Sequence, residues 1–339
     1  MKKTKFLLRA GVWLACAASA LCLGTGALAL EADYLVPVGR AVGIRLTTEG
    51  VAVAKVGEVE CADGTAAPAA AAGMQAGDVI RSLGGRTIST AEDFLTAASG
   101  LDGESVEILA TREGQDILFS VTPALSADGA YRLGLWLRDG VNGIGTVTFY
   151  DPDSGVYGAL GHGVSEENEL IAFDAGTLSD TSIEAVIPGA KNSPGELCGH
   201  APDGESIASV ESNTLCGIFG IAEQDFTGGA LPVDADEEIA LGSATVLANV
   251  RGGEVEEFDV EITRIYHDNG ERGLMLHVTD PSLLAVTGGI VQGMSGSPII
   301  QGGKLVGAVT HVLVSDPTRG YGITIGKMLS AVDESGKAA

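Results

Sequence analysis

The sequence predicts a mainly β protein built from two folded modules, a small α/β module followed by a larger all-β module. Glycine supplies 49 of the 339 residues and aromatic residues only 5%, a composition that suits strands and turns better than long helical bundles. Short apolar or alternating runs recur along the chain, separated by Gly, Asp and Pro turns, which is typical of many short strands. The length leaves room for two domains with buried cores.

The N-terminus predicts a targeting segment over residues 1–30. A cluster of Lys and Arg precedes a nearly continuous apolar run over residues 11–30, and residues 27–29 form an A-x-A motif of the kind that signal peptidases cleave. The run is also long enough to span a bilayer, so we expect either a cleaved signal peptide or a retained transmembrane anchor. In both cases the basic flank stays in the cytoplasm and the rest of the chain is exported.

The net charge argues against two classes of binding partner, and the cysteines indicate how the thiols are used. The net charge of −25 argues against nucleic acid and against an anionic membrane surface. Beyond the leader, which holds Cys16 and Cys22, the cysteines are Cys61, Cys198 and Cys216, without the C-x-x-C spacing of a zinc site. We expect buried free thiols, with a Cys198–Cys216 disulfide as the alternative, and neither a metal nor a cofactor.

The first module is predicted to cover residues 34–124. Strand-like runs at residues 42–46 and 51–54 lead through an Ala-rich connection to the run over residues 72–80. Thr90, with Asp93 three residues later, predicts a capped helix over residues 91–99. Residues 106–121 then form a predicted hairpin.

The run over residues 72–80 (AGMQAGDVI), followed by this helix, resembles a PDZ domain of the bacterial protease type. A PDZ domain binds a peptide as an added strand and holds its C-terminal carboxylate in a backbone loop. The resemblance places this loop at Val42, Gly43 and Ile44. The alternative is that these residues only begin a strand.

The second module is predicted over residues 125–339. Short strands are expected at residues 131–137, 143–150, 206–210, 241–250, 256–266 and 273–278. This pattern favours a closed or sandwiched all-β domain. A helix is expected only near residues 327–332.

A candidate nucleophile lies in the segment 293–298 (GMSGSP), between two apolar runs. Ser295 stands among small residues that allow a substrate backbone to approach, and the glycines let the loop turn its N–H groups toward one point. The N–H groups of Gly293 and Ser295 are therefore the candidate oxyanion hole. An ordinary strand–loop–strand corner is the alternative, since Gly-Ser clusters also mark turns.

A serine nucleophile needs a base and, in a triad, a carboxylate that orients the base. His162 lies between glycines after an apolar strand and is the candidate base. Asp280, which ends a strand shortly before the serine loop, and Asp174 are the candidate carboxylates, and spacing alone does not choose between them. The other histidines are His200 and His267 in polar loops, His277 within a strand, and His311, which could line a pocket.

Two long strings, residues 143–162 and residues 279–322, resemble stage IV sporulation protein B (SpoIVB). The resemblance implies a serine peptidase of the chymotrypsin-like, double β-barrel clan. It implies His162, Asp280 and Ser295 as catalytic residues, although Asp280 lies closer to the serine than is usual in the clan. It also implies that Thr310, His311 and Val312 pair with the substrate backbone.

The same resemblance implies a role in spore formation, in the space between mother cell and forespore. Such a peptidase cleaves itself and a membrane-bound regulatory protein that silences an intramembrane protease, which triggers processing of a late sigma factor. A catalytically silent PDZ scaffold that regulates a membrane protease complex is the alternative from another class. A quality-control protease of the HtrA type is disfavoured, because there the PDZ follows the peptidase.

Overall fold

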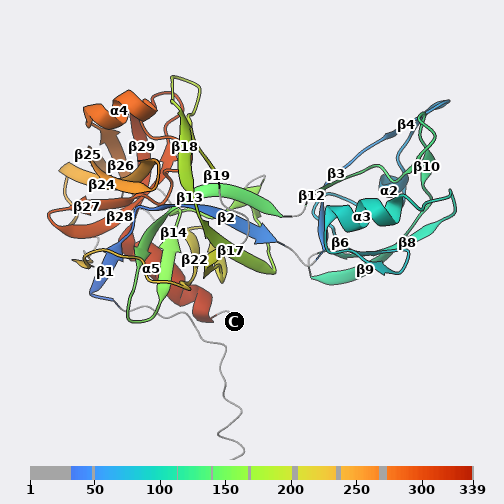
Figure 1. Cartoon of the computed structure of the whole chain (residues 1–339), viewed down its shortest axis with the longest axis horizontal. Helices are drawn as coiled ribbons and strands as arrows, with labels where there is room; N and C mark the ends of the chain where they lie inside the picture. Colours follow the sequence, from blue (N-terminus) through green and yellow to red (C-terminus); the bar gives the residue numbers. More distant parts are fainter. Residues whose placement is uncertain are drawn as a thin grey trace, which may run out of the picture.

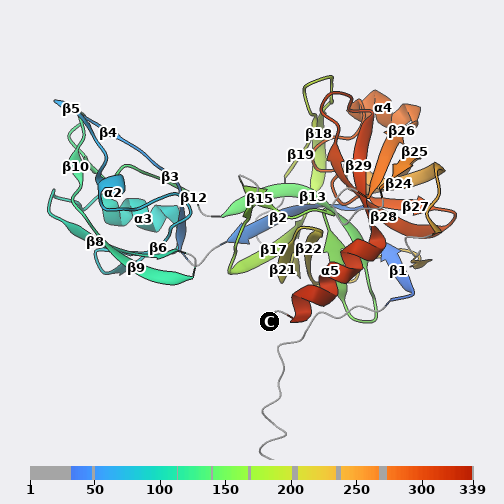
Figure 2. The same cartoon turned by 180° about the vertical axis from the view of Figure 1, so that it is seen from behind.

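The computed structural model describes residues 32–47, 50–112, 114–138, 140–166, 169–200, 205–233, 238–266 and 273–337. The predicted leader, with Cys16 and Cys22, and His267 lie outside these residues. The chain folds into a small lobe and a larger β lobe, which stand side by side in both views (Figures 1 and 2). Among the described helices, none has the length and apolar character needed to cross a membrane.

The small lobe is a sheet with two helices. The sheet order is β12 (Leu135–Arg138), β3 (Val51–Val56), β6 (Val79–Leu83), β8 (Val106–Arg112) and β9 (Gln115–Val121), with β7 (Arg86–Thr87) on β6. The helices are α2 (Pro68–Ala71) and α3 (Ala91–Ala98), and short pairs join β4 (Val59–Cys61) to β5 (Gly64–Ala66) and β10 (Ala124–Leu125) to β11 (Tyr131–Arg132). The capping box predicted at Thr90 and Asp93 is confirmed. Phe94 of α3 packs into the core of this sheet.

An ion pair fixes the turn before β6. The side chain of Asp78 is fully buried, and the guanidinium of Arg112 lies 2.6 Å from its Oδ1 and 2.8 Å from its Oδ2. Asp78 Oδ2 also accepts the N–H of Gln75 at 3.0 Å. The aspartate of the AGMQAGDVI motif therefore holds the turn that starts β6.

The large lobe begins with an open sheet. Its order is β20 (Ser206–Ser209), β17 (Ala175–Asp180), β2 (Ala41–Thr47), β13 (Val141–Tyr150), β14 (Val156–Ala159), β22 (Gly217–Ile221) and β21 (Ser212–Thr214). β1 (Tyr34–Pro37) pairs with both β13 and β23 (Leu231–Pro232). Two hairpins extend from it, β15 (Ser165–Glu166) with β16 (Glu169–Leu170) and β18 (Ser182–Ile187) with β19 (Glu196–His200).

The second half of the large lobe is a closed barrel. Its strands run in the order β24 (Gly242–Arg251), β25 (Glu254–Ile265), β26 (Leu274–Val278), β29 (Arg319–Thr324), β28 (Lys304–Val312) and β27 (Pro298–Gln301). The predicted C-terminal helix is present as α5 (Ile325–Lys337), and its Met328 and Val332 are buried in a core with Phe219 of the open sheet. The prediction of a closed or sandwiched all-β module is thus confirmed.

Helix α4 (Pro281–Thr287) was not expected. Its signals are local: Asp280 is the N-cap, Pro281 is the first helical residue, and Gly288 ends the helix at φ 71°. The prediction treated Asp280 only as a catalytic candidate and overlooked its value as a helix start.

The structure corrects the predicted boundary between the modules. β2 pairs on one side with β13 (Ile44 opposite Gly143) and on the other with β17 (Ile44 opposite Leu178), so residues 41–47 belong to the large lobe. Conversely β12, expected in the second module, pairs with β3. The small lobe is therefore an insertion between β2 and β13. The reason for the difference is that a strand's own pattern does not reveal its partners, which are set by contacts distant in the sequence.

None of the three cysteines of the described chain, Cys61, Cys198 and Cys216, forms a disulfide, and each is partly exposed. The alternative disulfide between Cys198 and Cys216 is therefore not formed in the structure. The expectation of free thiols is confirmed, although they are half-buried rather than buried.

Candidate active site

The loop that holds the candidate nucleophile, Ser295, connects α4 to β27. Gly293 and Gly296 adopt φ values of 95° and 98°, a region that favours glycine. The turn is closed by Ser297 N–H, which donates to Met294 O at 3.0 Å, and by Gly296 N–H, which donates to Val309 O at 2.8 Å. The glycines of the motif therefore permit a tight loop around the serine.

Thr146 of β13 ties this loop to the open sheet. Its N–H donates to Ser295 O at 2.9 Å and its hydroxyl donates to Gly293 O at 2.8 Å. Thr146 is buried, so both hydrogen bonds are shielded from water. A Cβ added at Gly296 would lie 1.9 Å from Thr146 O. The two halves of the large lobe therefore meet at the loop of Ser295.

The N–H groups of Gly293 and Ser295, the predicted oxyanion hole, are not used by the protein. Within the described chain, neither group donates a hydrogen bond to any acceptor. Two uncommitted backbone donors beside a serine hydroxyl are the arrangement that stabilises an acyl-transfer oxyanion.

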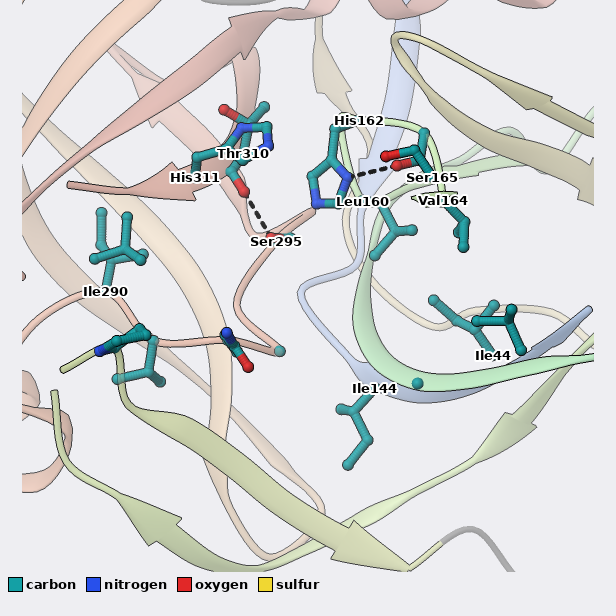
Figure 3. A pocket seen from close by; sticks show the side chains of 18 of the residues that line it. Ile44, Ile144, Leu160, His162, Val164, Ser165, Ile290, Ser295, Thr310 and His311 are labelled. Atoms are coloured by element: carbon teal, nitrogen blue, oxygen red, sulfur yellow. Dashed lines mark hydrogen bonds between the residues drawn. The ribbon is translucent and has the colours of Figure 1, made fainter. Parts of the chain in front are cut away.

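His162 follows β14 in a turn where Leu160 and Gly161 have φ values of 70° and 67°. Its Nδ1 lies 2.9 Å from Gly163 O (Figure 3). A carbonyl oxygen only accepts hydrogen bonds, so Nδ1 carries the proton in this contact and Nε2 is left as the basic nitrogen. The geometry therefore selects the tautomer that a general base requires.

The end of β28 lies against both residues. Ser295 Oγ donates to Thr310 O at 2.6 Å (Figure 3), and the rings of His162 and His311 have centroids 4.7 Å apart at 35°. A hydroxyl has a single proton to donate. The Ser295 hydroxyl must therefore turn away from Thr310 before it can give its proton to His162.

His162 and Ser295 line one cavity of about 510 Å³, together with Thr310, His311 and Val312. The remaining lining is mostly apolar and includes Ile44, Ile144, Leu160, Val164, Leu170, Leu215, Ile290, Val291 and Val314. His162 and His311 are the ionisable residues among the described ones that line it. Such a cavity suits an apolar side chain next to the bond to be cleaved.

A second cavity, of about 840 Å³, adjoins the first, because Gln292 and Gly293 line both. It is more polar, with Arg45, Glu196 and Glu205 on its wall. A bound chain can therefore extend to both sides of Ser295.

The structure does not bring Asp280 to His162. Asp280 Oδ1 accepts the N–H groups of Ser282 and Leu283 at 2.8 and 3.0 Å and the hydroxyl of Ser282 at 2.5 Å. Asp259 N–H donates to its Oδ2 at 3.3 Å. These hydrogen bonds, that of the Ser282 hydroxyl foremost, hold the pKa of Asp280 below its usual value of 3.8. The carboxylate is thus committed to the start of α4.

Asp174, the other candidate carboxylate, lies in the exposed segment before β17, where its N–H donates to Thr47 O at 2.9 Å. Neither Asp174 nor Asp280 lines the cavity of His162 and Ser295. Sequence reasoning missed two residues of this region, Thr146 and Asn213. Thr146 lies inside the string 143–162 that carried the family resemblance. Asn213 had no signal, because its partners are backbone groups of residues 164 and 171.

A second candidate site lies in the small lobe, between α3 and β12. A cavity of about 850 Å³ is lined there by Phe94, Leu95 and Ala98 of α3 and by residues 130–136. β12 is an edge strand of its sheet, so its outer edge can pair with a peptide. The N–H groups of Leu133 and Gly134 donate to no acceptor in the described part of the chain, and Gly134 has a φ of 72°.

This arrangement corrects the predicted carboxylate loop. Val42, Gly43 and Ile44 lie inside β2 of the large lobe, where Gly43 and Ile44 are paired on both sides. The features of a carboxylate-binding loop are found instead at Leu133 and Gly134, where free N–H groups precede the edge strand. The candidate carboxylate loop therefore lies at the end of the small lobe and not at its beginning.

The large lobe joins a β-barrel to an open sheet, and a serine in a glycine-rich loop and a histidine line the cavity between them. This arrangement defines a serine peptidase of the chymotrypsin-like type, here with an inserted PDZ module. A scan against family models agrees: the model described as SpoIVB peptidase S55 matches residues 129–329 and a PDZ domain model matches residues 64–112. Since the first match covers more than half of the chain, this protein belongs to the SpoIVB peptidase S55 family.

The search of curated proteins found no match. Among solved structures, the chain is similar to one titled "Crystal structure of Rv3671c protease, inactive form", at 17% identity and a TM-score of 0.34. The match covers 57% of this chain and 84% of that one.

Proposed function

We propose that this protein is a serine endopeptidase in which Ser295 is the nucleophile and His162 the general base. The observation that carries the proposal is the convergence of Ser295, His162 and two uncommitted N–H groups on one cavity. The histidine offers Nε2 as the base because Gly163 O holds its other nitrogen in the protonated form.

The chemistry follows from these positions. Ser295 Oγ attacks the scissile carbonyl carbon while its proton passes to His162 Nε2, and the carbonyl oxygen becomes an oxyanion bound by the N–H groups of Gly293 and Ser295. The C–N bond then breaks, and the proton on His162 goes to the departing amine. Water attacks the acyl-enzyme in the same way and releases the second product.

The end of β28 supports the proposed role of residues 310–312 in substrate binding. One edge of β28 pairs with β29, with His311 opposite Tyr321 and Val312 opposite Gly320. On the other edge, the pairing with β27 stops at Ala308. Beyond Ala308, the end of β28 lines the cavity with Thr310, His311 and Val312, so a substrate strand can lie along β28 at this point.

The biological setting is proposed from family membership together with the N-terminal sequence. The substrates are the protein itself and a membrane-bound regulator of an intramembrane protease, and their cleavage triggers processing of a late sigma factor during sporulation. The protein acts outside the cytoplasm, membrane-anchored or released, in the space between the forespore and mother-cell membranes. The PDZ groove along β12 binds a peptide with a free C-terminus and so helps to select the target.

A fluorophosphonate probe, which reacts with activated serines, tests the proposed chemistry. We expect the purified chain to be labelled and to nick itself on a gel time course, and Ser295→Ala and His162→Ala to lose both properties while keeping the thermal transition of the parent. A folded parent that neither reacts with the probe nor cleaves itself or an unfolded peptide pool would favour the silent scaffold.

The PDZ groove has an independent test. Leu95 on α3 is 67% exposed and faces the groove, so Leu95→Lys should abolish binding of C-terminal peptides from a peptide library without lowering stability. Leu118, 60% exposed and outside the groove-lining residues, offers the matched control Leu118→Lys. Equal binding by the parent and both variants would contradict the assignment of the groove.

A further inference from the structure

The side chain of Asn213 on β21 holds the peptide group that contacts His162. Asn213 Oδ1 accepts the N–H of Val164 at 2.8 Å, and its Nδ2 donates to Val164 O at 2.8 Å and to Ile171 O at 3.0 Å. The N–H of Val164 belongs to the same peptide unit as Gly163 O. That carbonyl oxygen is the partner of His162 Nδ1.

A peptide unit is planar and rigid. A hydrogen bond that fixes the N–H of Val164 therefore also fixes the direction of the Gly163 carbonyl. The two ends of one peptide group connect the Asn213 amide to the His162 imidazole. We propose that Asn213, through the Gly163–Val164 peptide, positions His162 and selects its tautomer, the task that a triad gives to a carboxylate, and that Asp280 serves instead as the cap of α4. This inference rests on the proposed function.

The surroundings leave this peptide little freedom. A Cβ added at Gly163 would lie 2.2 Å from Leu170 Cδ2 and 2.5 Å from Thr214 O, so the turn is packed on that side. Asn213 itself belongs to a paired strand, opposite the fully buried Ile218. The amide is thus a fixed point on the sheet, and the loop after His162 is attached to it.

The contacts of Asp280 agree with this division of roles. Its carboxylate oxygens accept hydrogen bonds from residues 259, 282 and 283, and His162 is not among the groups that shift its pKa. Asparagine is as good an N-cap as aspartate, whereas alanine is poor. Capping and catalytic orientation therefore make opposite predictions for Asp280→Asn.

The test compares the rate of fluorophosphonate labelling of the full chain with that of Asn213→Ala, Asn213→Asp, Asp280→Asn and Asp280→Ala. Asn213→Ala should slow labelling by about 10²-fold, the order expected when a catalytic group is misplaced by about 1 Å. Asn213→Asp keeps an acceptor for Val164 N–H but cannot donate to Val164 O and Ile171 O, so it should recover only part of the rate. Asp280→Asn should stay within about threefold of the parent, because Asn caps a helix as well as Asp does.

Asn249→Ala is the matched control for a general loss of stability. Asn249 is a buried amide of β24 whose Nδ2 donates to the carbonyls of residues 251, 252 and 254, far in the sequence from the loop of His162. Asn249→Ala should lower the melting temperature at least as much as Asn213→Ala does and leave the rate of fluorophosphonate labelling unchanged.

A second readout reports the tautomer directly. The chain has 5 histidines, so ¹⁵N-imidazole labelling with His162→Gln as the assignment control identifies the His162 signals. At neutral pH, the parent and Asp280→Asn should show protonated Nδ1, and Asn213→Ala should show a mixture of tautomers. This spectrum is readable even if the chain proves to have no peptidase activity, so failure of the proposed function is distinguishable from failure of this inference.

A loss of about 10⁴-fold in folded Asp280→Asn, the effect known for a triad aspartate, would overturn the inference. An unchanged rate and an unchanged tautomer in folded Asn213→Ala would overturn it as well. If Asn213→Ala does not fold, Asp280→Asn and the tautomer of the parent still decide.

Discussion

Gly296→Ala should separate the nucleophile loop from β13. Gly296 has a φ of 98°, and an added Cβ would lie 1.9 Å from Thr146 O and 2.6 Å from Leu160 N. Both neighbours are backbone atoms that cannot move by a side-chain rotation. The methyl group therefore forces the loop away from the strand, and the hydrogen bonds of Thr146 to Ser295 O and Gly293 O are stretched or lost.

The size of the effect follows from two costs. A side chain at this φ costs about 1–3 kcal/mol, and the forced displacement of packed atoms adds about 1–3 kcal/mol. The free energy of unfolding should therefore fall by about 2–6 kcal/mol, which for a lobe of this size corresponds to a decrease in melting temperature of about 5–20 °C. Labelling of Ser295 by the fluorophosphonate should fall by at least about 10²-fold, because the oxyanion donors move with the loop.

Gly302→Ala is the matched control. Gly302 has a φ of 60° in the turn between β27 and β28, and an added Cβ would meet no atom within 4 Å. It should cost only the backbone strain, about 1–2 kcal/mol, and leave labelling intact. Differential scanning calorimetry measures both variants, and the fluorescence of Trp136, the sole tryptophan of the described residues, follows the small lobe separately. A Gly296→Ala variant with the melting temperature of Gly302→Ala and the labelling rate of the parent would refute the contact between the loop and β13.

Three further predictions concern charges. The Tyr150 hydroxyl donates to Asp225 at 2.7 Å, and this hydrogen bond is the main reason why the pKa of Tyr150 is raised from 10.0 to about 12. The stability that this raised pKa contributes is fully present below pH 10 and is lost as the pH rises toward about 12. Tyr150→Phe should lower the free energy of unfolding by about 1–3 kcal/mol at neutral pH and should remove this loss of stability at alkaline pH. If the melting temperature of Tyr150→Phe still falls over the same alkaline range, Tyr150 is not the group responsible. The lowered pKa of Asp280 contributes stability above pH 3.8 that is lost as the pH falls through the folded value, and Asp280→Asn should remove this part of the acid destabilisation in a pH titration by circular dichroism. Arg112→Met leaves the buried carboxylate of Asp78 without its partner and should destabilise the small lobe by about 3–5 kcal/mol, read from Trp136 fluorescence in urea; a change below about 1 kcal/mol would show that this ion pair does not hold the lobe.

Local signals predicted a large part of this protein. The capping box at Thr90, the glycines around Ser295 and the short strands each depend on residues close in the sequence, so they could be recognised without a structure. The same holds for the PDZ motif of residues 72–80, which the family model for residues 64–112 confirms. His162 and Ser295 were chosen from their glycine-rich surroundings, and the fold brings them to the same cavity.

Pairings between distant segments could not be predicted in the same way. Residues 41–47 have the pattern of a strand, but their partners β13 and β17 begin only at residues 141 and 175. This pairing places Val42, Gly43 and Ile44 in the large lobe and not in the PDZ module. The orientation of His162 depends on a backbone carbonyl, which every residue possesses and which carries no sequence signal.

The sequence by itself thus determined the mainly β class, the PDZ motif and the residues able to act as nucleophile and base, because these follow from residue type and short-range spacing. Only the tertiary structure decided that the PDZ module is an insertion and that the Asp280 carboxylate caps α4. It also decided that Thr146 hydrogen-bonds to the loop of Ser295 and Asn213 to the loop that follows His162. The physical reason is that hydrogen-bond partners are set by which strands pack together, and that choice is made by the whole core at once.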